Sequence, residues 1–228
     1  MSSLRRALLL EAFPGMFAKA PGVLSQEDHL DGKKWKEIER VWYVRITDWD
    51  QLAYATSFEY QIQNDVRVKD EGHDGLLRVR KTLKATGEGE SFAPPIYSLI
   101  AKVKEGQGAA AHNDEAALEV TGDFFDLFSR LSSKGMRKDR YHFPVKGSQL
   151  LFEVDCFLTP EYQQAREQGT VCTGEKYFPW AKIDLELPDE NVTIPDLPIQ
   201  YEELIAQTAE KNPDIDKLYD QYFLHVNQ

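Results

Sequence analysis

The sequence predicts an α+β fold built on a mostly antiparallel sheet of about eight strands, either closed into a barrel or strongly curved. Three observations predict it. From residue 35 to about residue 187, side chains of different polarity alternate with a period of two, the pattern of half-buried strands. The connections between these stretches are short, as antiparallel neighbours allow. Short helical patterns flank this region and interrupt it twice.

The expected strands are bounded by turn signals such as Lys146-Gly147-Ser148. They span residues 35–46, 57–68, 75–83, 96–104, 115–121, 137–145, 149–158 and 181–187. The connecting turns and loops include residues 69–75, 87–95, 105–113 and 146–148. The sequence contains no internal repeat, so we expect these strands to form a single unit.

The helical patterns define the ends of the domain. Residues 1–34 predict a short amphipathic helix and a polar linker, and the apolar run there is too short for an export signal or a membrane span. Within the strand region, residues 122–131 predict one short helix and 158–169 another, because Thr159-Pro160-Glu161 is a good helix start. Residues 199–225 predict a C-terminal helical segment. We therefore divide the chain into an extension (1–34) and a main domain (35–228).

Composition excludes some classes of function. Lys plus Arg (27) against Asp plus Glu (38) gives a net charge of -11, which disfavours a protein that coats duplex DNA. Cys156 and Cys172 are the whole cysteine content, so we expect neither a disulfide framework nor a thiolate metal cluster. Together with the absence of a membrane signal, this predicts a cytoplasmic protein.

Charged residues are sorted by strand. Glu37 and Glu39 share one face, because side chains two apart on a strand point the same way, and Arg78 and Arg80 are the basic counterpart. On one strand alone, a solvent-facing side would explain the alternation. Repetition along several strands instead predicts an interior with an acidic and a basic side. The other acids are Glu119, Glu153, Asp155, Asp184 and Glu186, and the other bases are Lys102, Lys104, Lys138 and Arg140.

Such a face suits a metal and a polyphosphate. Carboxylates are the ligands that Mg2+ or Mn2+ prefers, and Arg and Lys neutralise phosphate oxygens. Together they can hold a triphosphate-containing small molecule and polarise its terminal phosphoryl group for attack by water. The sequence shows no Ser-His-Asp grouping, glycine-rich phosphate loop or zinc spacing. We therefore expect a Mg2+ or Mn2+ cofactor.

At these residues the chain resembles the CYTH superfamily of triphosphate tunnel metalloenzymes, which includes thiamine triphosphatases, class IV adenylyl cyclases, inorganic triphosphatases and RNA triphosphatases. The resemblance spans roughly residues 35–190 in the family's order, with Val41 where the opening Glu-x-Glu-x-Lys motif has lysine. The similar motifs are Glu37-Ile38-Glu39-Arg40-Val41, Arg78-Val79-Arg80, Lys138-Asp139-Arg140-Tyr141, Glu153-Val154-Asp155-Cys156-Phe157 and Asp184-Leu185-Glu186-Leu187.

The resemblance implies an eight-stranded antiparallel barrel that forms a tunnel flanked by helices. It implies that Glu37, Glu39, Lys102 and Arg140 take part in catalysis. It also implies that the metal is held by Glu37, Glu39, Asp155 and Glu186, with Glu119, Glu153 and Asp184 as further ligands or positioning groups. The phosphates would contact Arg78, Arg80, Lys102, Lys104, Lys138 and Arg140.

Several functions stay open at this point. The first is metal-dependent hydrolysis of inorganic tripolyphosphate, thiamine triphosphate or a nucleoside triphosphate, and adenylyl cyclase activity is a separate possibility. The second, suggested by Val41, is a catalytically impaired protein that binds or sequesters a nucleotide or polyphosphate. The third is an interaction protein with a vestigial tunnel. A homodimer through the apolar helix at 123–131 is equally open.

Overall fold

The computed structural model describes residues 35–70, 73–86, 92–105, 112–132, 134–187, 191–206 and 217–218. This part of the chain forms one nine-stranded antiparallel sheet, two α-helices and a 3-10 helix. The α+β class predicted from the sequence is therefore confirmed. The predicted N-terminal helix and linker, residues 1–34, lie outside the described residues.

All eight predicted strands are present, with one more after them. The strands are β1 (Trp35–Arg45), β2 (Ser57–Asp70), β3 (His73–Lys84), β4 (Ile96–Glu105), β5 (His112–Glu119), β6 (Lys134–Pro144), β7 (Leu151–Leu158), β8 (Tyr177–Leu187) and β9 (Glu203–Ala206). The helices are η2 (Asp50–Tyr54), α2 (Gly122–Ser129) and α3 (Pro160–Gln168). β2 and β3 stay paired as far as Asp70 and His73, so most of the turn expected at 69–75 is strand.

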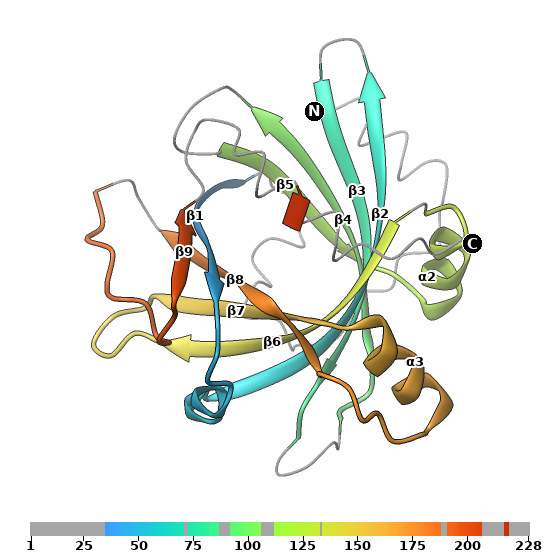
Figure 1. The fold of residues 1–228 in the computed structure, drawn as a ribbon. Helices are drawn as coiled ribbons and strands as arrows, with labels where there is room; N and C mark the ends of the chain where they lie inside the picture. Colours follow the sequence, from blue (N-terminus) through green and yellow to red (C-terminus); the bar gives the residue numbers. More distant parts are fainter. Residues whose placement is uncertain are drawn as a thin grey trace.

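The strand order is β5-β4-β3-β2-β6-β7-β8-β1-β9, and β1 pairs additionally with β5. The two partners share one edge of β1. Trp35–Ile38 pair with β5, whereas Trp42–Arg45 pair with β9. Figure 1 shows the sheet curling round on itself, with α2 and α3 on its outer side. Strands from opposite ends of the order thus meet along β1.

The helix predicted over 199–225 is wrong at Glu203–Ala206, which form strand β9. Since β5 runs along only half of the β1 edge, backbone groups of Trp42–Arg45 on that edge need other partners. β9 supplies them, and the side chains add an ion pair of 2.7 Å between Arg45 Nη1 and Glu203 Oε1. Residues 207–216 and 219–225 of the predicted helix lie outside the described residues.

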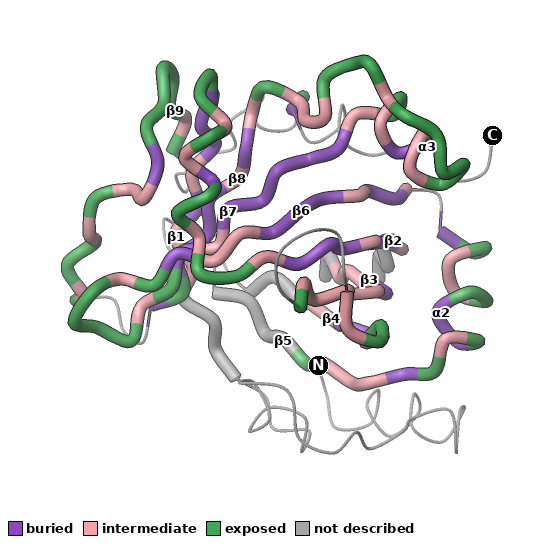
Figure 2. The backbone as a smooth tube through the Cα atoms, turned by 90° about the horizontal axis from the view of Figure 1, so that it is seen from below, coloured by how far each residue is buried: buried purple, intermediate pink, exposed green. Residues whose placement is uncertain are grey.

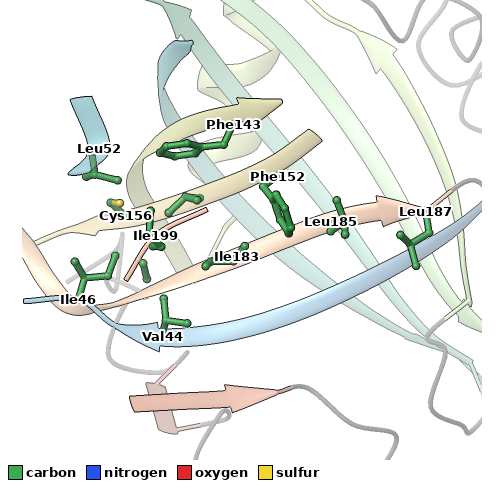
Figure 3. Close-up of a cluster of buried hydrophobic side chains, with 12 residues drawn as sticks. Val44, Ile46, Leu52, Phe143, Phe152, Cys156, Ile183, Leu185, Leu187 and Ile199 are labelled. Carbon is green, nitrogen blue, oxygen red and sulfur yellow. The ribbon is translucent and has the colours of Figure 1, made fainter. Parts of the chain in front are cut away.

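The main apolar core lies on the outer face of the sheet, and Figure 3 shows its side chains. Val154 on β7 and Ile183 and Leu185 on β8 are fully buried there. Leu52 of η2 and Ile199 of the segment 191–200 cover them. In Figure 2, buried stretches run along β6, β7 and β8. Successive side chains of a strand point to opposite faces, so the residues between these apolar positions lie on the other face of the sheet.

α2 covers a second apolar cluster on the outer face. Phe124 and Phe125 pack there against Val79 of β3 and Leu99 of β4. The Thr121 hydroxyl accepts a hydrogen bond from the backbone N–H of Phe124 at 3.2 Å and so caps the helix. The helix predicted at 122–131 is therefore confirmed.

α3 confirms the helix predicted at 158–169. Thr159 caps it, with Pro160 in the first turn, and Gly169 ends it at a φ of 65°, a left-handed conformation that suits glycine. Arg166 fixes the helix on β2 and β6, with its guanidinium carbon 4.1 Å from the centre of the Tyr60 ring. No helix in the described part of the chain is long and apolar enough to cross a membrane.

Replacement of Leu185 by alanine should lower the free energy of unfolding by about 2–5 kcal/mol, because it leaves a cavity in a fully buried cluster. Urea denaturation measures this change. Leu131→Ala removes the same atoms from a side chain that is 71% exposed, and should change the free energy by less than about 0.5 kcal/mol. Equal effects of the two substitutions would contradict this description of the core.

Candidate functional site

The predicted site residues all lie on the face opposite the main core. Register partners on neighbouring strands share a face, and Glu39 is the partner of Glu186, as Arg140 is of Asp155. Register partners share a face in every strand pair of the sheet. By this criterion, none of the predicted site residues lies on the outer face. Glu37 and Lys104 are placed by backbone register alone.

The strand order groups the predicted acids on one set of neighbouring strands and the predicted bases on another. β7, β8, β1 and β5 are consecutive neighbours and carry the acids, whereas β4, β3 and β6 carry the bases, with β2 between the last two. The acids are Glu153 and Asp155 on β7, Asp184 and Glu186 on β8, Glu37 and Glu39 on β1, and Glu119 on β5. The bases are Lys102 and Lys104 on β4, Arg78 and Arg80 on β3, and Lys138 and Arg140 on β6.

This charged face is the inner face of the curl. Val41 and Tyr43 of β1 pack in one cluster with Met136 of β6 and Phe157 of β7, although β7 and β8 separate β1 from β6 in the sheet. α2 packs on the opposite face of β3 and β4 and lies on the outer side of the curl in Figure 1, so the charged residues face inward. Leu218 joins the same cluster, which forms an apolar floor beside the charged residues.

Arg140 is the centre of a buried ion-pair network. Its Nε and Nη2 donate to the two carboxylate oxygens of Asp155 at 2.7 and 2.9 Å, and its Nη1 contacts Glu153. The Nη2 atom also lies 3.7 Å from Asp184 Oδ2. Lys138 Nζ, also from β6, contacts Asp155 Oδ2. A bidentate arginine–carboxylate pair fixes both side chains, so this part of the face is rigidly oriented.

Burial and neighbouring charge shift the pKa values of this network in opposite directions. Burial would raise the pKa of Glu153, but Arg140 and a hydrogen bond from His142 lower it to about 2. Burial also opposes the ionisation of Asp155, yet Arg140 and Lys138 hold its pKa well below the usual range. The pKa of Lys138 falls to about 7, because burial and the Arg140 charge outweigh Asp155.

A second ion-pair group joins β1 and β8. Lys182 Nζ lies 2.5 and 2.6 Å from the two oxygens of Asp184 and 3.6 Å from Glu39 Oε1. Burial raises the pKa of Asp184 to about 7; Lys182 opposes this shift, whereas Glu39 and Asp155 add to it. Lys182 was not among the residues predicted from the sequence.

Sequence reasoning also missed β2. Glu59, Gln61, Gln63 and Asp65 lie on the inner face between β3 and β6, and all four are buried. Asp65 accepts from Arg78 Nε and Nη2 at 2.9 and 3.1 Å. Polar side chains at every second position are the signal that could have found them. The two amides carry no charge, so the strand did not stand out as acidic or basic.

Two of the predicted residues lie near the ends of their strands. Glu186 is exposed near the end of β8. Glu119 stands opposite Ser98 at the end of β5, whereas β5 pairs with β1 through residues 112–115. The structure thus brings together the acids of β7 and β8 with Glu39, and leaves Glu119 nearer to the basic strand β4.

Carboxylates are suitable ligands for a hard divalent cation, but Lys182 already lies between two of them. Among the described side chains, no group of three or more His, Cys, Asp or Glu could hold a metal ion. Glu39 and Asp184 do converge, and the point at which they converge is Lys182 Nζ. Oxygen donors of this kind suit Mg2+ or Mn2+. A divalent cation there would take the place of the Lys182 ammonium group.

Comparison with known proteins adds no relative. No protein-family model matches the chain, and no curated protein matches it. The function is therefore inferred from the residues of the inner face and their geometry.

Arg140→Met should lower the free energy of unfolding by about 3–5 kcal/mol, because it leaves the buried Asp155 and the partly buried Glu153 without their main counter-ion. Urea denaturation at neutral pH gives the value. Arg45→Met removes an arginine from an exposed pair with Glu203, and should change stability by less than about 1 kcal/mol. A loss below about 1 kcal/mol for Arg140→Met would contradict the buried network.

The lowered pKa of Glu153 predicts a dependence of stability on acid. A folded-state pKa below the unfolded value stabilises the protein above about pH 4.5, and this stabilisation is lost as the pH falls toward about 2. Between about pH 5 and pH 3, the wild type should therefore lose about 1–2 kcal/mol more than Glu153→Gln. Denaturant titrations at both pH values test this. Equal losses in the two proteins would show that Glu153 is not held ionised by Arg140.

Proposed function

We propose that the inner face is a triphosphate site, closed into a tunnel through the β1–β5 pairing, as in the family the sequence resembles. The protein would bind inorganic tripolyphosphate, thiamine triphosphate or a nucleoside triphosphate and hydrolyse it with Mg2+ or Mn2+. One observation carries the proposal: a single concave face gathers acids mainly on β7, β8, β1 and β5 and bases mainly on β3, β4 and β6. A chain of phosphates needs cations from several directions, and this face supplies them.

Phosphate binding falls to the bases of β3, β4 and β6. Arg78 and Arg140 are held in fixed orientations by Asp65 and Asp155, so part of their donor fork is positioned before an anion arrives. Lys138, with a pKa of about 7, would take up a proton when a polyanion binds nearby. The full set proposed to contact phosphate is Arg78, Arg80, Lys102, Lys104, Lys138 and Arg140.

Hydrolysis falls to the acidic side. Glu39, Asp155 and Asp184 are the described carboxylates that would hold the cation, and Glu37 precedes Glu39 on the same strand face. Glu119, Glu153 and Glu186 would orient these ligands or the water around them. Bound Mg2+ or Mn2+ would polarise the terminal phosphoryl group for attack by water.

A second candidate function is binding without hydrolysis. Two observations favour it over an active hydrolase. Val41, an apolar residue, stands opposite Asp184 in register, where the resemblance implies a cation on β1. Glu153, Asp155 and Asp184 also already contact Lys or Arg. A face that neutralises its own charge could hold a nucleotide or polyphosphate and leave it intact.

The state of the cysteines fits a protein of a reducing compartment. Cys156 is buried and Cys172 is partly exposed, and both are free thiols. A buried thiol in the core takes no part in the charged face. We therefore keep the cytoplasm as the proposed location.

Phosphate release from tripolyphosphate, thiamine triphosphate and ATP, each with Mn2+ or Mg2+, tests hydrolysis. The wild type should release phosphate only with metal, and Glu37→Ala/Glu39→Ala should lower the rate by about a hundredfold or more, because it removes carboxylates of the cation site. Metal-dependent binding by calorimetry without any release would favour the second candidate. Release that is equal in the double variant would contradict the assignment of the acidic side.

Arg80→Gln should weaken the binding of tripolyphosphate by about tenfold or more, because it removes a half-buried cation that faces the inside of the curl. Isothermal titration calorimetry at fixed ionic strength gives the dissociation constants. Arg130→Gln, at the exposed end of α2, removes the same charge elsewhere and should bind like the wild type. Equal weakening by both substitutions would mean that only the overall charge matters.

A further inference from the structure

Lys182 occupies an unusual place for a basic residue. It lies on the acidic strand β8, two positions before Asp184 and therefore on the same face. Its side chain is only 13% exposed, and its Nζ contacts both oxygens of Asp184 as well as Glu39. It thus bridges two carboxylates that come from different strands.

Two carboxylates this close need a cation between them. The Asp184 side chain is 4% exposed and that of Glu39 is 17% exposed, so water screens their repulsion poorly. Arg140, the other cation near Asp184, is 3.7 Å away and makes its bidentate contact with Asp155. The neutralisation of the Glu39–Asp184 pair therefore falls mainly to Lys182.

The register partners of Asp184 and Lys182 on β1 and β7 carry no positive charge that could neutralise the pair. On β1, the register partner of Asp184 is Val41 and that of Lys182 is Tyr43, and neither carries a positive charge. On β7, the partner of Lys182 is Asp155, a further acid. An ammonium group on a flexible stem can settle among these oxygens as a point charge, which is the part that a small metal ion would otherwise play.

We propose that Lys182 is a resident cation of the acidic side, which occupies the position between Glu39 and Asp184 and competes with a divalent cation for it. This inference rests on the proposed function, since it concerns the same carboxylates. It adds two consequences. The acidic side is stable without metal, and a divalent cation binds between Glu39 and Asp184 only by displacing the Lys182 ammonium group.

Mn2+ binding to the full chain, measured from the EPR signal of free Mn2+, tests the competition. Lys182→Met should bind Mn2+ at least about tenfold more tightly than the wild type, because the competing ammonium group is gone. Lys182→Arg keeps the charge and should bind Mn2+ as weakly as the wild type. Lys146→Met removes a lysine from the exposed β6–β7 turn and should also match the wild type. Glu39→Gln added to Lys182→Met should abolish the gain.

Mn2+ affinity that is unchanged or weaker in Lys182→Met would overturn the inference. Lys182→Gln carries the same expectation and replaces the methionine variant if circular dichroism shows that variant unfolded. Tripolyphosphate binding to the wild type, followed by calorimetry, separates this outcome from failure of the proposed function. If tripolyphosphate binds and the Lys182 variants gain no Mn2+ affinity, the inference fails and the triphosphate site stands. If the Lys182 variants gain Mn2+ affinity and tripolyphosphate does not bind, the inference stands and the proposed triphosphate site fails.

Discussion

Neutralisation of buried charge on the inner face is the constraint on which the rest of this structure depends. Asp155 is almost fully buried, and it stays ionised because Arg140 donates to both of its oxygens and Lys138 contacts one of them. A buried ion left without its partner destabilises a protein by about 3–5 kcal/mol. The acidic strand β7 must therefore lie beside the basic strand β6, and the strand order obeys this requirement.

The apolar outer face makes that arrangement possible. Val154 and Ile183 are register partners on β7 and β8 and pack against η2 and the segment 191–200. A slip of one residue between these strands would turn the apolar residues inward and Asp155 outward. The core therefore sets the register, and the register decides which charges meet. The apolar core and the candidate site thus lie on opposite faces of the same strands.

Much of this could be predicted from the sequence because it depends on local pattern. Paired charges such as Glu153 and Asp155 identify the inner face of a strand by alternation alone, and Thr159-Pro160 starts α3 wherever the helix lies in space. β9 could not be predicted, since its four residues form a strand only because β5 leaves half of the β1 edge unpaired. That condition depends on strand lengths on the far side of the sheet.

The part played by Lys182 escaped prediction for a related reason. A lysine that shares a strand face with acids has the pattern of an ordinary solvated face. Only the pairing of β8 with β1 brings Lys182 to Glu39. Gln61 and Gln63 of β2 were missed because neutral amides carry no charge signal, although they are almost completely buried on the inner face. Contacts between strands distant in sequence thus decide how the inner face is completed.

The proposal that the inner face binds a triphosphate is tested most directly by a crystal structure of the protein with tripolyphosphate and Mn2+. Anomalous scattering would locate the manganese. We expect phosphate density on the inner face against Arg80 and Lys138. We also expect manganese near Glu39 and Asp184, with the Lys182 side chain displaced. Tripolyphosphate bound only on the outer surface, with the inner ion pairs unchanged, would contradict it.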